Sequence, residues 1–186
     1  MSYRLPDWRY EEIKLEVAKI LIKCNITRLP INGFEIANKL GIIVIPYSAV
    51  NEEKRKALIK EDEDGFFLKR KGKYYIYYND NKIYGRINFT ILHEIGHIIL
   101  DHTQHSKLAE AEANFFAKYT IAPPVLIDKF CNDTIYINVL FNIYDNFDVT
   151  ETSGYNCWRY YLHWKRNYNK VNKYTNYEEM ILTQFC

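Results

Sequence analysis

The segment His93-Glu94-Ile95-Gly96-His97 has the residue types and spacing of a zinc peptidase helix, H-E-x-x-H. On an α-helix, residues four positions apart lie on one face, so both histidines can bind one metal ion. Glu94 lies beside that face, where its carboxylate can accept a proton from a water held by the metal. The pattern predicts hydrolysis of peptide bonds, with His93 and His97 as metal ligands and Glu94 as the catalytic base.

A catalytic zinc site needs a third protein ligand and an open fourth position. In one arrangement a third histidine follows in the pattern H-E-x-x-H-x-x-G-x-x-H, but Leu100 occupies the glycine position here and Thr103 the histidine position. His102 comes one residue early, and we interpret it, like His105, as a polar loop residue after the helix end. Zinc is the expected metal, although two histidines and a carboxylate also suit manganese or iron.

An acidic residue on the next predicted helix can complete the site. Glu110 and Asn114 are four residues apart and share a helix face. Glu110 can therefore bind the metal while Asn114, as a second-shell residue, hydrogen-bonds a ligand imidazole. Glu112 points about 200° away from Glu110 around the same helix. We expect Glu110 to be the third ligand and keep Glu112 as the fallback metal ligand.

The periodicity of apolar residues predicts the elements that position these side chains. Helices are expected over residues 8–24, 32–40, 84–100 and 107–121, and strands over 42–47, 65–69 and 73–79. The last two strands are joined by the turn Arg70-Lys71-Gly72 and predict a hairpin. Pro123 predicts a helix break near Ala122, with only helices from there to about Tyr168. The order predicts an α+β fold, mainly helical, with a small antiparallel β-sheet next to the H-E-x-x-H helix in a zincin-like core.

Composition predicts a soluble globular protein of 186 residues. We expect a core of residues 1–130, formed by the N-terminal helices and the small sheet, and a helical region of residues 131–186 packed on the same domain. A net charge of +2 does not by itself argue for nucleic acid or a membrane. No apolar run is long enough to span a bilayer, and the N-terminus has no apolar signal core, so a cytoplasmic protein is expected. The four cysteines are widely spaced and expected to be reduced, mostly buried thiols.

The stretch between Glu151 and Glu178 has no acidic residue and mixes Lys and Arg with Tyr and Trp. We interpret it as an aromatic helix that packs on the core and exposes a basic face. Direct DNA binding through residues 155–174 is the weaker alternative. The preceding Phe147-Asp148-Val149-Thr150 resembles part of a helix-turn-helix.

The two motifs together resemble the ImmA/IrrE family of metallopeptidases, in which an H-E-x-x-H helix is followed by E-x-E-A-N-x-F-A. The second motif reads Glu110-Ala111-Glu112-Ala113-Asn114-Phe115-Phe116-Ala117 here. The resemblance covers about residues 8–165 and is strongest over 84–124. One departure is Tyr119-Thr120-Ile121-Ala122-Pro123, where the family has a Leu-rich, Met-Pro ending; this change predicts a different wall of the cleft.

The resemblance implies a cytosolic zinc endopeptidase that cleaves a helix-turn-helix transcriptional repressor of a mobile element, prophage or stress response. The alternative is a non-catalytic, metal-containing interaction or DNA-associated regulatory module. An intact Glu94 favours the peptidase, because a structural metal site has no need for a base.

Overall fold

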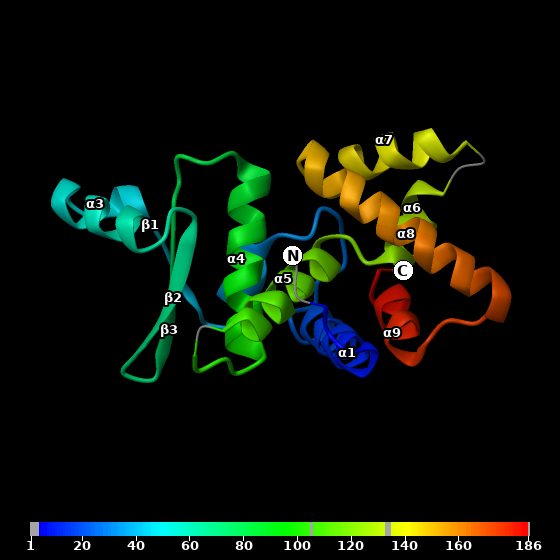
Figure 1. The fold of residues 1–186 in the computed structure, drawn as a ribbon, viewed down its shortest axis with the longest axis horizontal. Coiled ribbons are helices and arrows are strands. Elements are labelled where there is room, and N and C mark those ends of the chain that lie inside the picture. The colour runs from blue at the N-terminus through cyan, green and yellow to red at the C-terminus, as the bar shows by residue number, and fades with distance from the viewer. Residues whose placement is uncertain (1–3, 105, 133–134, 186) are drawn as a thin grey trace.

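The computed structural model of the chain describes residues 4–104, 106–132 and 135–185 (Figure 1). In these ranges the elements are, in chain order, α1 (Asp7–Lys23), α2 (Gly33–Lys39), β1 (Ile43–Pro46), the 3-10 helix η1 (Tyr47–Ala49), α3 (Glu52–Glu61), β2 (Gly65–Arg70), β3 (Lys73–Tyr78), α4 (Tyr84–Ile99), α5 (Lys107–Ile121), α6 (Pro124–Cys131), α7 (Tyr136–Phe147), α8 (Glu151–Val171) and α9 (Asn176–Gln184). The fold is α+β and mainly helical, which confirms the fold class predicted from the sequence.

Three strands form a small sheet in the order β1-β3-β2. The predicted hairpin is present: β2 and β3 pair antiparallel, and Lys71 and Gly72 both have positive φ in the turn between them. β1 pairs with β3 in parallel, so the sheet is mixed rather than wholly antiparallel. Parallel neighbours need a long crossover, which η1, α3 and β2 provide. Within the described residues β2 is an edge strand.

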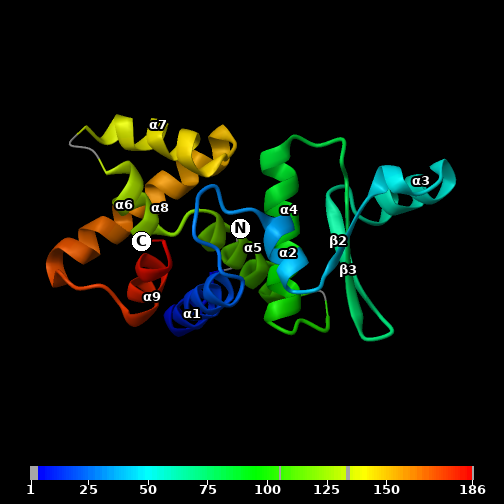
Figure 2. The same cartoon turned by 180° about the vertical axis from the view of Figure 1, so that it is seen from behind.

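Helix α4 lies at the centre of the molecule, between the sheet on one side and helices α1 and α6 to α9 on the other (Figure 1). Helix α2 packs against α4, as the reverse view shows (Figure 2). The Asn88 side chain on α4 fixes that contact, because it accepts from Gly33 N and donates to the Ile31 carbonyl. A Cβ atom at Gly96 would lie 3.1 Å from the Phe116 ring on α5, so glycine permits the two motif-bearing helices to approach closely.

Local signals explain where several helices begin. Asn32 caps α2 by accepting from the backbone N–H groups of Phe34 and Glu35, and the Ser106 hydroxyl caps α5 by accepting from Ala109 N. Helix α1 differs: Pro6 occupies the N-cap position and Asp7 lies in the first turn. A carboxylate there still stabilises the positive end of the helix dipole.

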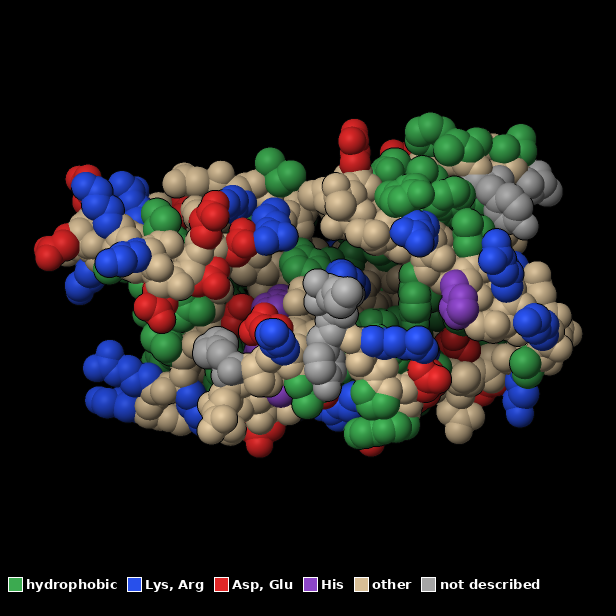
Figure 3. Space-filling model, viewed as in Figure 1, with side chains coloured by type: hydrophobic (Ala, Val, Ile, Leu, Met, Phe, Trp, Pro, Cys, Tyr) green, Lys and Arg blue, Asp and Glu red, His purple; other side chains and the backbone are tan. Residues whose placement is uncertain are grey.

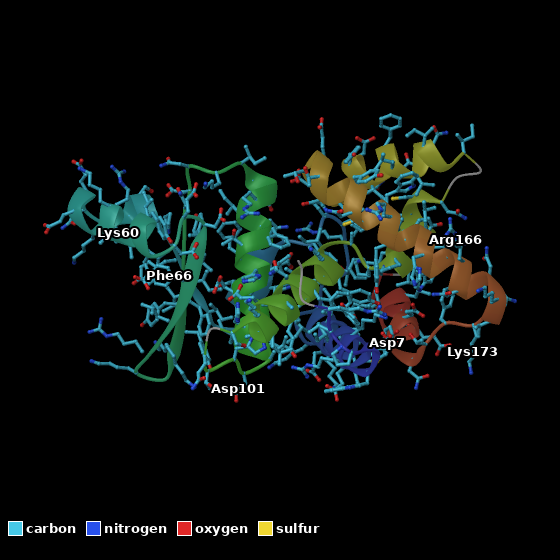
Figure 4. All side chains as sticks on the ribbon, in the orientation of Figure 1. Asp7, Lys60, Phe66, Asp101, Arg166 and Lys173 are labelled. Atoms are coloured by element: carbon cyan, nitrogen blue, oxygen red, sulfur yellow. The ribbon has the colours of Figure 1, made fainter. Side chains whose placement is uncertain are left out.

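Helices α6 to α9 lie at the end of the molecule opposite the sheet (Figure 1). The aromatic side of α8 packs inward: Tyr161 is buried and donates a hydrogen bond to Asp128 Oδ1 at 2.8 Å, and Trp164 donates to Glu178. Arg166 and Lys173 are exposed at that end, far from α4 (Figure 4). The packing confirms the interpretation of a core-packing aromatic helix with a solvated basic face.

The C-terminal helices share one core with the N-terminal part. Ile181 and Phe185 belong to the same buried cluster as Ile13, and the Tyr177 hydroxyl donates to Glu11 Oε2 at 2.6 Å. The division into residues 1–130 and 131–186 stays a prediction. Cys24, Cys131 and Cys157 are free, and Cys186 lies outside the described residues. None of the helices in the described ranges combines the length and hydropathy needed to cross a bilayer.

Candidate metal centre

His93, His97 and Glu110 come together where α5 crosses α4. The Nε2 atoms of His93 and His97 are 3.0 Å apart. Glu110 Oε2 lies 3.4 Å from Nε2 of His93, and Glu110 Oε1 lies 3.4 Å from Nε2 of His97. One potential ligand atom from each residue lies within 4.8 Å of the others. The two motifs therefore place three potential ligands around one point; their role as ligands stays a prediction.

The dimensions of this cluster suit a divalent metal. Zinc–nitrogen distances of about 2.0–2.1 Å and tetrahedral angles place ligand atoms about 3.3 Å apart. The two Nε2 atoms are 3.0 Å apart and each lies 3.4 Å from a different Glu110 oxygen, close to that value, and a set with one oxygen lies within 4.8 Å. Two imidazole nitrogens and a carboxylate are a ligand set of zinc, and they also suit manganese or iron. The residues thus fit the metal that the sequence predicts and do not decide between these ions.

Glu94 lies beside the cluster with its side chain buried, and its Oε1 is 4.0 Å from Nε2 of His93. Burial raises the pKa of Glu94 to about 8; the nearby carboxylates of Asp62 and Glu110 add to the increase, and a hydrogen bond from the Phe67 backbone opposes it. Strand β2 thus holds the carboxyl group that α4 supplies. Once ionised, a carboxylate with a raised pKa is a stronger base than an exposed one, and a bound metal cation beside it would favour the ionised form.

The cavity at this site has a volume of about 210 Å³ and is predominantly acidic. Four carboxyl groups line it, together with a single guanidinium group: Asp62, Asp64, Glu94, Glu110 and Arg86. Arg86 is paired with Asp64, its Nε lying 3.0 Å from Oδ1. The excess of carboxylates gives the cavity a negative potential that favours cation binding.

The raised pKa of Glu94 predicts a pH-dependent effect on the stability of the metal-free protein. Above about pH 4.5 the unfolded state loses this proton, while the folded state retains it up to about pH 8, so the wild-type free energy of unfolding falls as pH rises through this window. Glu94→Gln removes that loss. We expect the variant to exceed the wild type by roughly 2–5 kcal/mol at pH 8 and by much less at pH 4.5.

Urea unfolding in the presence of a chelator measures this difference. Comparing the two proteins at each pH cancels the titration of the histidines, which both contain. An equal difference in unfolding free energy at pH 4.5 and pH 8 would contradict the burial-raised pKa.

His102 is the functional candidate that the sequence analysis missed. Its side chain is 10% exposed, and its Nδ1 lies 2.8 Å from Nδ1 of His97. Its Nε2 lies 2.8 Å from Glu112 Oε2, and Arg9 holds the Glu112 carboxylate with two hydrogen bonds of 2.7 and 2.8 Å. His102 does follow the end of α4, as the sequence predicted, but its imidazole is not a solvent-facing loop side chain. His105, interpreted in the same way, lies outside the described residues.

The end of α4 explains the position of His102. Asp101 adopts a left-handed conformation with φ of 54°, and His102 N donates to the His97 carbonyl at 3.0 Å. Together with the bond from Asp101 N to the Ile98 carbonyl, this is a Schellman motif, which turns the chain back over the last helical turn. Glycine usually occupies the left-handed position, so the sequence lacked the signal that would have revealed this turn.

With His102 neutral, its contact with Glu112 fixes which nitrogens carry protons in this network. The Glu112 carboxylate can only accept, so Nε2 of a neutral His102 carries the proton and its Nδ1 accepts. His97 then donates from Nδ1, and the lone pair of its Nε2 is directed to the cluster. By contrast, Nδ1 of His93 is buried without a hydrogen-bond partner among the described residues.

The contacts of Glu112 and Asn114 differ from the roles expected for them, a fallback metal ligand and a hydrogen-bond partner of a ligand imidazole. Glu112 belongs to the network with Arg9 and His102, which engages both of its oxygens, so the structure gives no support to its use as a fallback ligand. Asn114 lines the acidic cavity, and its Nδ2 donates to the Glu110 carbonyl at 2.7 Å. His102 is one partner of the His97 imidazole, and a hydrogen bond from Asn114 to a ligand imidazole stays a prediction.

The comparisons with known proteins agree with this geometry. The model of the Peptidase_M78 family, described as an IrrE N-terminal-like domain, matches residues 37–153. The matched segment contains β1, the hairpin and both motif-bearing helices. No curated protein matches the chain. Because the family model spans more than half of the chain, the protein belongs to this family of metallopeptidases.

Proposed function

We propose that the protein is a metal-dependent endopeptidase, with zinc as the expected metal, and that its substrate is a helix-turn-helix transcriptional repressor. The observation that carries the catalytic part is the convergence of His93, His97 and Glu110 beside the buried carboxyl of Glu94. The nature of the substrate rests on the resemblance to the ImmA/IrrE family. We also infer a cytoplasmic location, where such a repressor would be found.

In this proposal His93, His97 and Glu110 would hold the ion beside the acidic cavity. A bound zinc ion would act as a Lewis acid, lowering the pKa of water and polarising the scissile carbonyl. Glu94 accepts a proton from the attacking water and delivers it to the leaving amine. The bond from the Phe67 backbone fixes the position of Glu94 for both transfers.

His102 is a positioning residue in this scheme. It touches His97, not the substrate, and its own orientation is fixed by Glu112 and Arg9. A ligand imidazole that donates its second N–H to a fixed acceptor is held in one tautomer and one ring orientation, which favours metal binding. The network extends from α1 to the metal centre, so the N-terminal helix contributes to the site.

The free edge of β2 supports a protein substrate in extended form. β2 begins at Gly65, which lines the acidic cavity, and no strand covers its outer edge among the described residues. The Phe66 side chain points to the face of the sheet away from α4 (Figure 4), whereas Phe67 faces His97 with 6.0 Å between ring centroids. A peptide added to this edge would run past the cluster, and backbone hydrogen bonds would bind it without strong sequence selection.

The alternative, a non-catalytic or DNA-associated module, has less support. A structural metal does not explain a buried carboxyl group beside its ligands. The exposed basic residues of α8 lie at the opposite end of the molecule from the sheet, and the adjacent aromatic side chains pack inward (Figure 4). We therefore retain DNA binding through residues 155–174 only as the weaker proposal.

Co-expression with a helix-turn-helix repressor encoded beside this protein tests the proposed function. Intact-mass analysis of the repressor should show two fragments that together account for its sequence, and adding a chelator to the purified pair should prevent further cleavage. A Glu94→Gln preparation controls for contaminating proteases. Stoichiometric binding of the repressor without any cleavage by the metal-loaded protein would instead support the non-catalytic alternative.

A further inference from the structure

A second cavity, of about 270 Å³, lies next to the acidic cavity and shares Phe89 with it. Its walls come from the C-terminal half of α5, the residues that follow it and the first turns of α8. Figure 3 shows the surface hollowed between the region around α4 and the region of α7 and α8, with hydrophobic side chains on the floor of the hollow. None of the residue roles described above uses this second cavity.

The cavity is close to the candidate metal centre on both motif-bearing helices. On α4, Phe89 precedes His93 by one turn, and their ring centroids are 6.2 Å apart. On α5, Lys118 continues the helix face that carries Glu110 and Asn114, because the three residues are spaced by four. An extended chain advances about 3.3 Å per residue. At Phe89 the cavity wall therefore lies within one or two substrate residues of the bond that Glu94 and the cluster would act on, whereas Lys118, about 12 Å along α5 from Glu110, is about four residues away.

The lining of the cavity is mainly apolar, in contrast to the acidic cavity beside it. Its walls include Phe89, Phe115, Ile121, Ala122 and Tyr160. The polar contributions come mostly from half-buried or exposed side chains, among them the single cation Lys118. A concave apolar wall with few polar groups selects apolar ligands, because burial of their surface is favourable and charged groups would lose hydration.

We propose that this cavity receives a large apolar side chain of the substrate, of the leucine, methionine or phenylalanine class, next to the scissile bond. The proposal rests on the proposed function and adds the property that selects the cleavage position. The free edge of β2 would bind the substrate backbone with little discrimination, and the cavity would supply the discrimination. A repressor segment would then be cut where such a side chain becomes accessible beside an extended stretch.

Peptide hydrolysis by the zinc-loaded full-length protein tests this assignment. The peptides share one extended sequence and differ at a single position, scanned across the scissile bond, with Leu, Phe, Met, Gly, Asp or Lys. At one position within two residues of the bond, Leu, Met or Phe should raise kcat/KM over Gly and Asp by at least about tenfold. Equal rates for all six residues at every position would overturn the proposal, as would a preference for Asp directed by Lys118.

Filling the cavity provides the matched variants. Ser153 and Asn156 line it from α8, whereas the neighbouring Thr152 is exposed and outside it. Ser153→Phe and Asn156→Phe should each reduce the apolar preference to about threefold or less, and Thr152→Phe should leave the preference ratio as in the wild type. Circular dichroism and thermal unfolding show which variants fold. With two filling variants, the test can still be made if one of them does not fold. A folded filling variant with an unchanged ratio would count against the cavity.

Binding to zinc-loaded Glu94→Gln separates this proposal from the proposed function. Calorimetry with the same peptides should show at least about tenfold tighter binding for the Leu, Met or Phe peptide than for the Gly peptide, and Ser153→Phe in the same background should remove that gain. If the peptides bind with this preference but the wild type does not cleave them, the proposed peptidase activity is contradicted, while the proposed binding of an apolar side chain in the cavity is supported. If the peptides bind without the preference, the proposed role of the cavity is overturned, even if the wild type cleaves them.

Discussion

Replacing Glu94 with glutamine should lower kcat/KM for peptide hydrolysis by about 10²–10⁴-fold, while the protein keeps its metal. The amide has nearly the shape of the carboxylate, and its oxygen can still accept the hydrogen bond from the Phe67 backbone. It cannot accept a proton from water. Glu94 is also outside the group of three potential ligands, so metal content, measured by elemental analysis after dialysis, should remain at one ion per chain.

A buried glutamate elsewhere provides the matched control for this change. Glu178 is 5% exposed and accepts hydrogen bonds from Trp164 and Thr175 at the start of α9, away from the cluster. Glu178→Gln should alter stability and leave kcat/KM within about threefold of the wild type. If Glu94→Gln retained the wild-type rate, or if Glu178→Gln lost as much activity, proton transfer by Glu94 would not be the basis of hydrolysis.

The parts of this structure that follow from local spacing were predictable. Residues four apart on one helix share a face whatever surrounds them, so the pairs His93–His97 and Glu110–Asn114 could be placed before the fold was known. The hairpin was equally visible, because a two-residue turn joins its strands. The parallel pairing of β1 was not, since nothing in a strand's own sequence specifies a partner 32 residues away.

The surroundings of the site depended on contacts between distant segments. Arg9 reaches Glu112 across more than 100 residues, and His102 joins them only because Asp101 takes a left-handed conformation. The second cavity similarly needs α8 to lie beside the end of α5. Tyr119, Ile121 and Ala122, from the stretch where the sequence departs from the ImmA/IrrE pattern, line this cavity. That the departure changes the wall of the cleft stays a prediction. Periodicity thus placed the potential ligands, and tertiary packing determined what holds them and what lies next to them.

The two glutamates of the E-x-E motif have different surroundings, and this difference predicts different effects on metal affinity. The Glu110 side chain is 45% exposed and faces the two histidines, whereas the Glu112 side chain is 6% exposed and bonded to Arg9 and His102. Glu110→Ala removes a potential ligand and should weaken zinc binding more than 100-fold, beyond the range of changes outside the ligand shell. Competition with a chromophoric chelator measures the dissociation constant.

Changes in the network behind His97 should weaken zinc binding less, by about 10–100-fold. His102→Phe removes the acceptor for Nδ1 of His97 and leaves that ring free to rotate. His102→Gln retains one donor and one acceptor, so it should recover part of the zinc affinity that His102→Phe loses. A purely structural role of His102 would not require this recovery. Glu53→Gln on the exposed surface of α3 is the control and should change nothing. If Glu112→Gln weakened zinc binding more than Glu110→Ala does, Glu112 would be the ligand, and the arrangement proposed for the metal centre would be wrong.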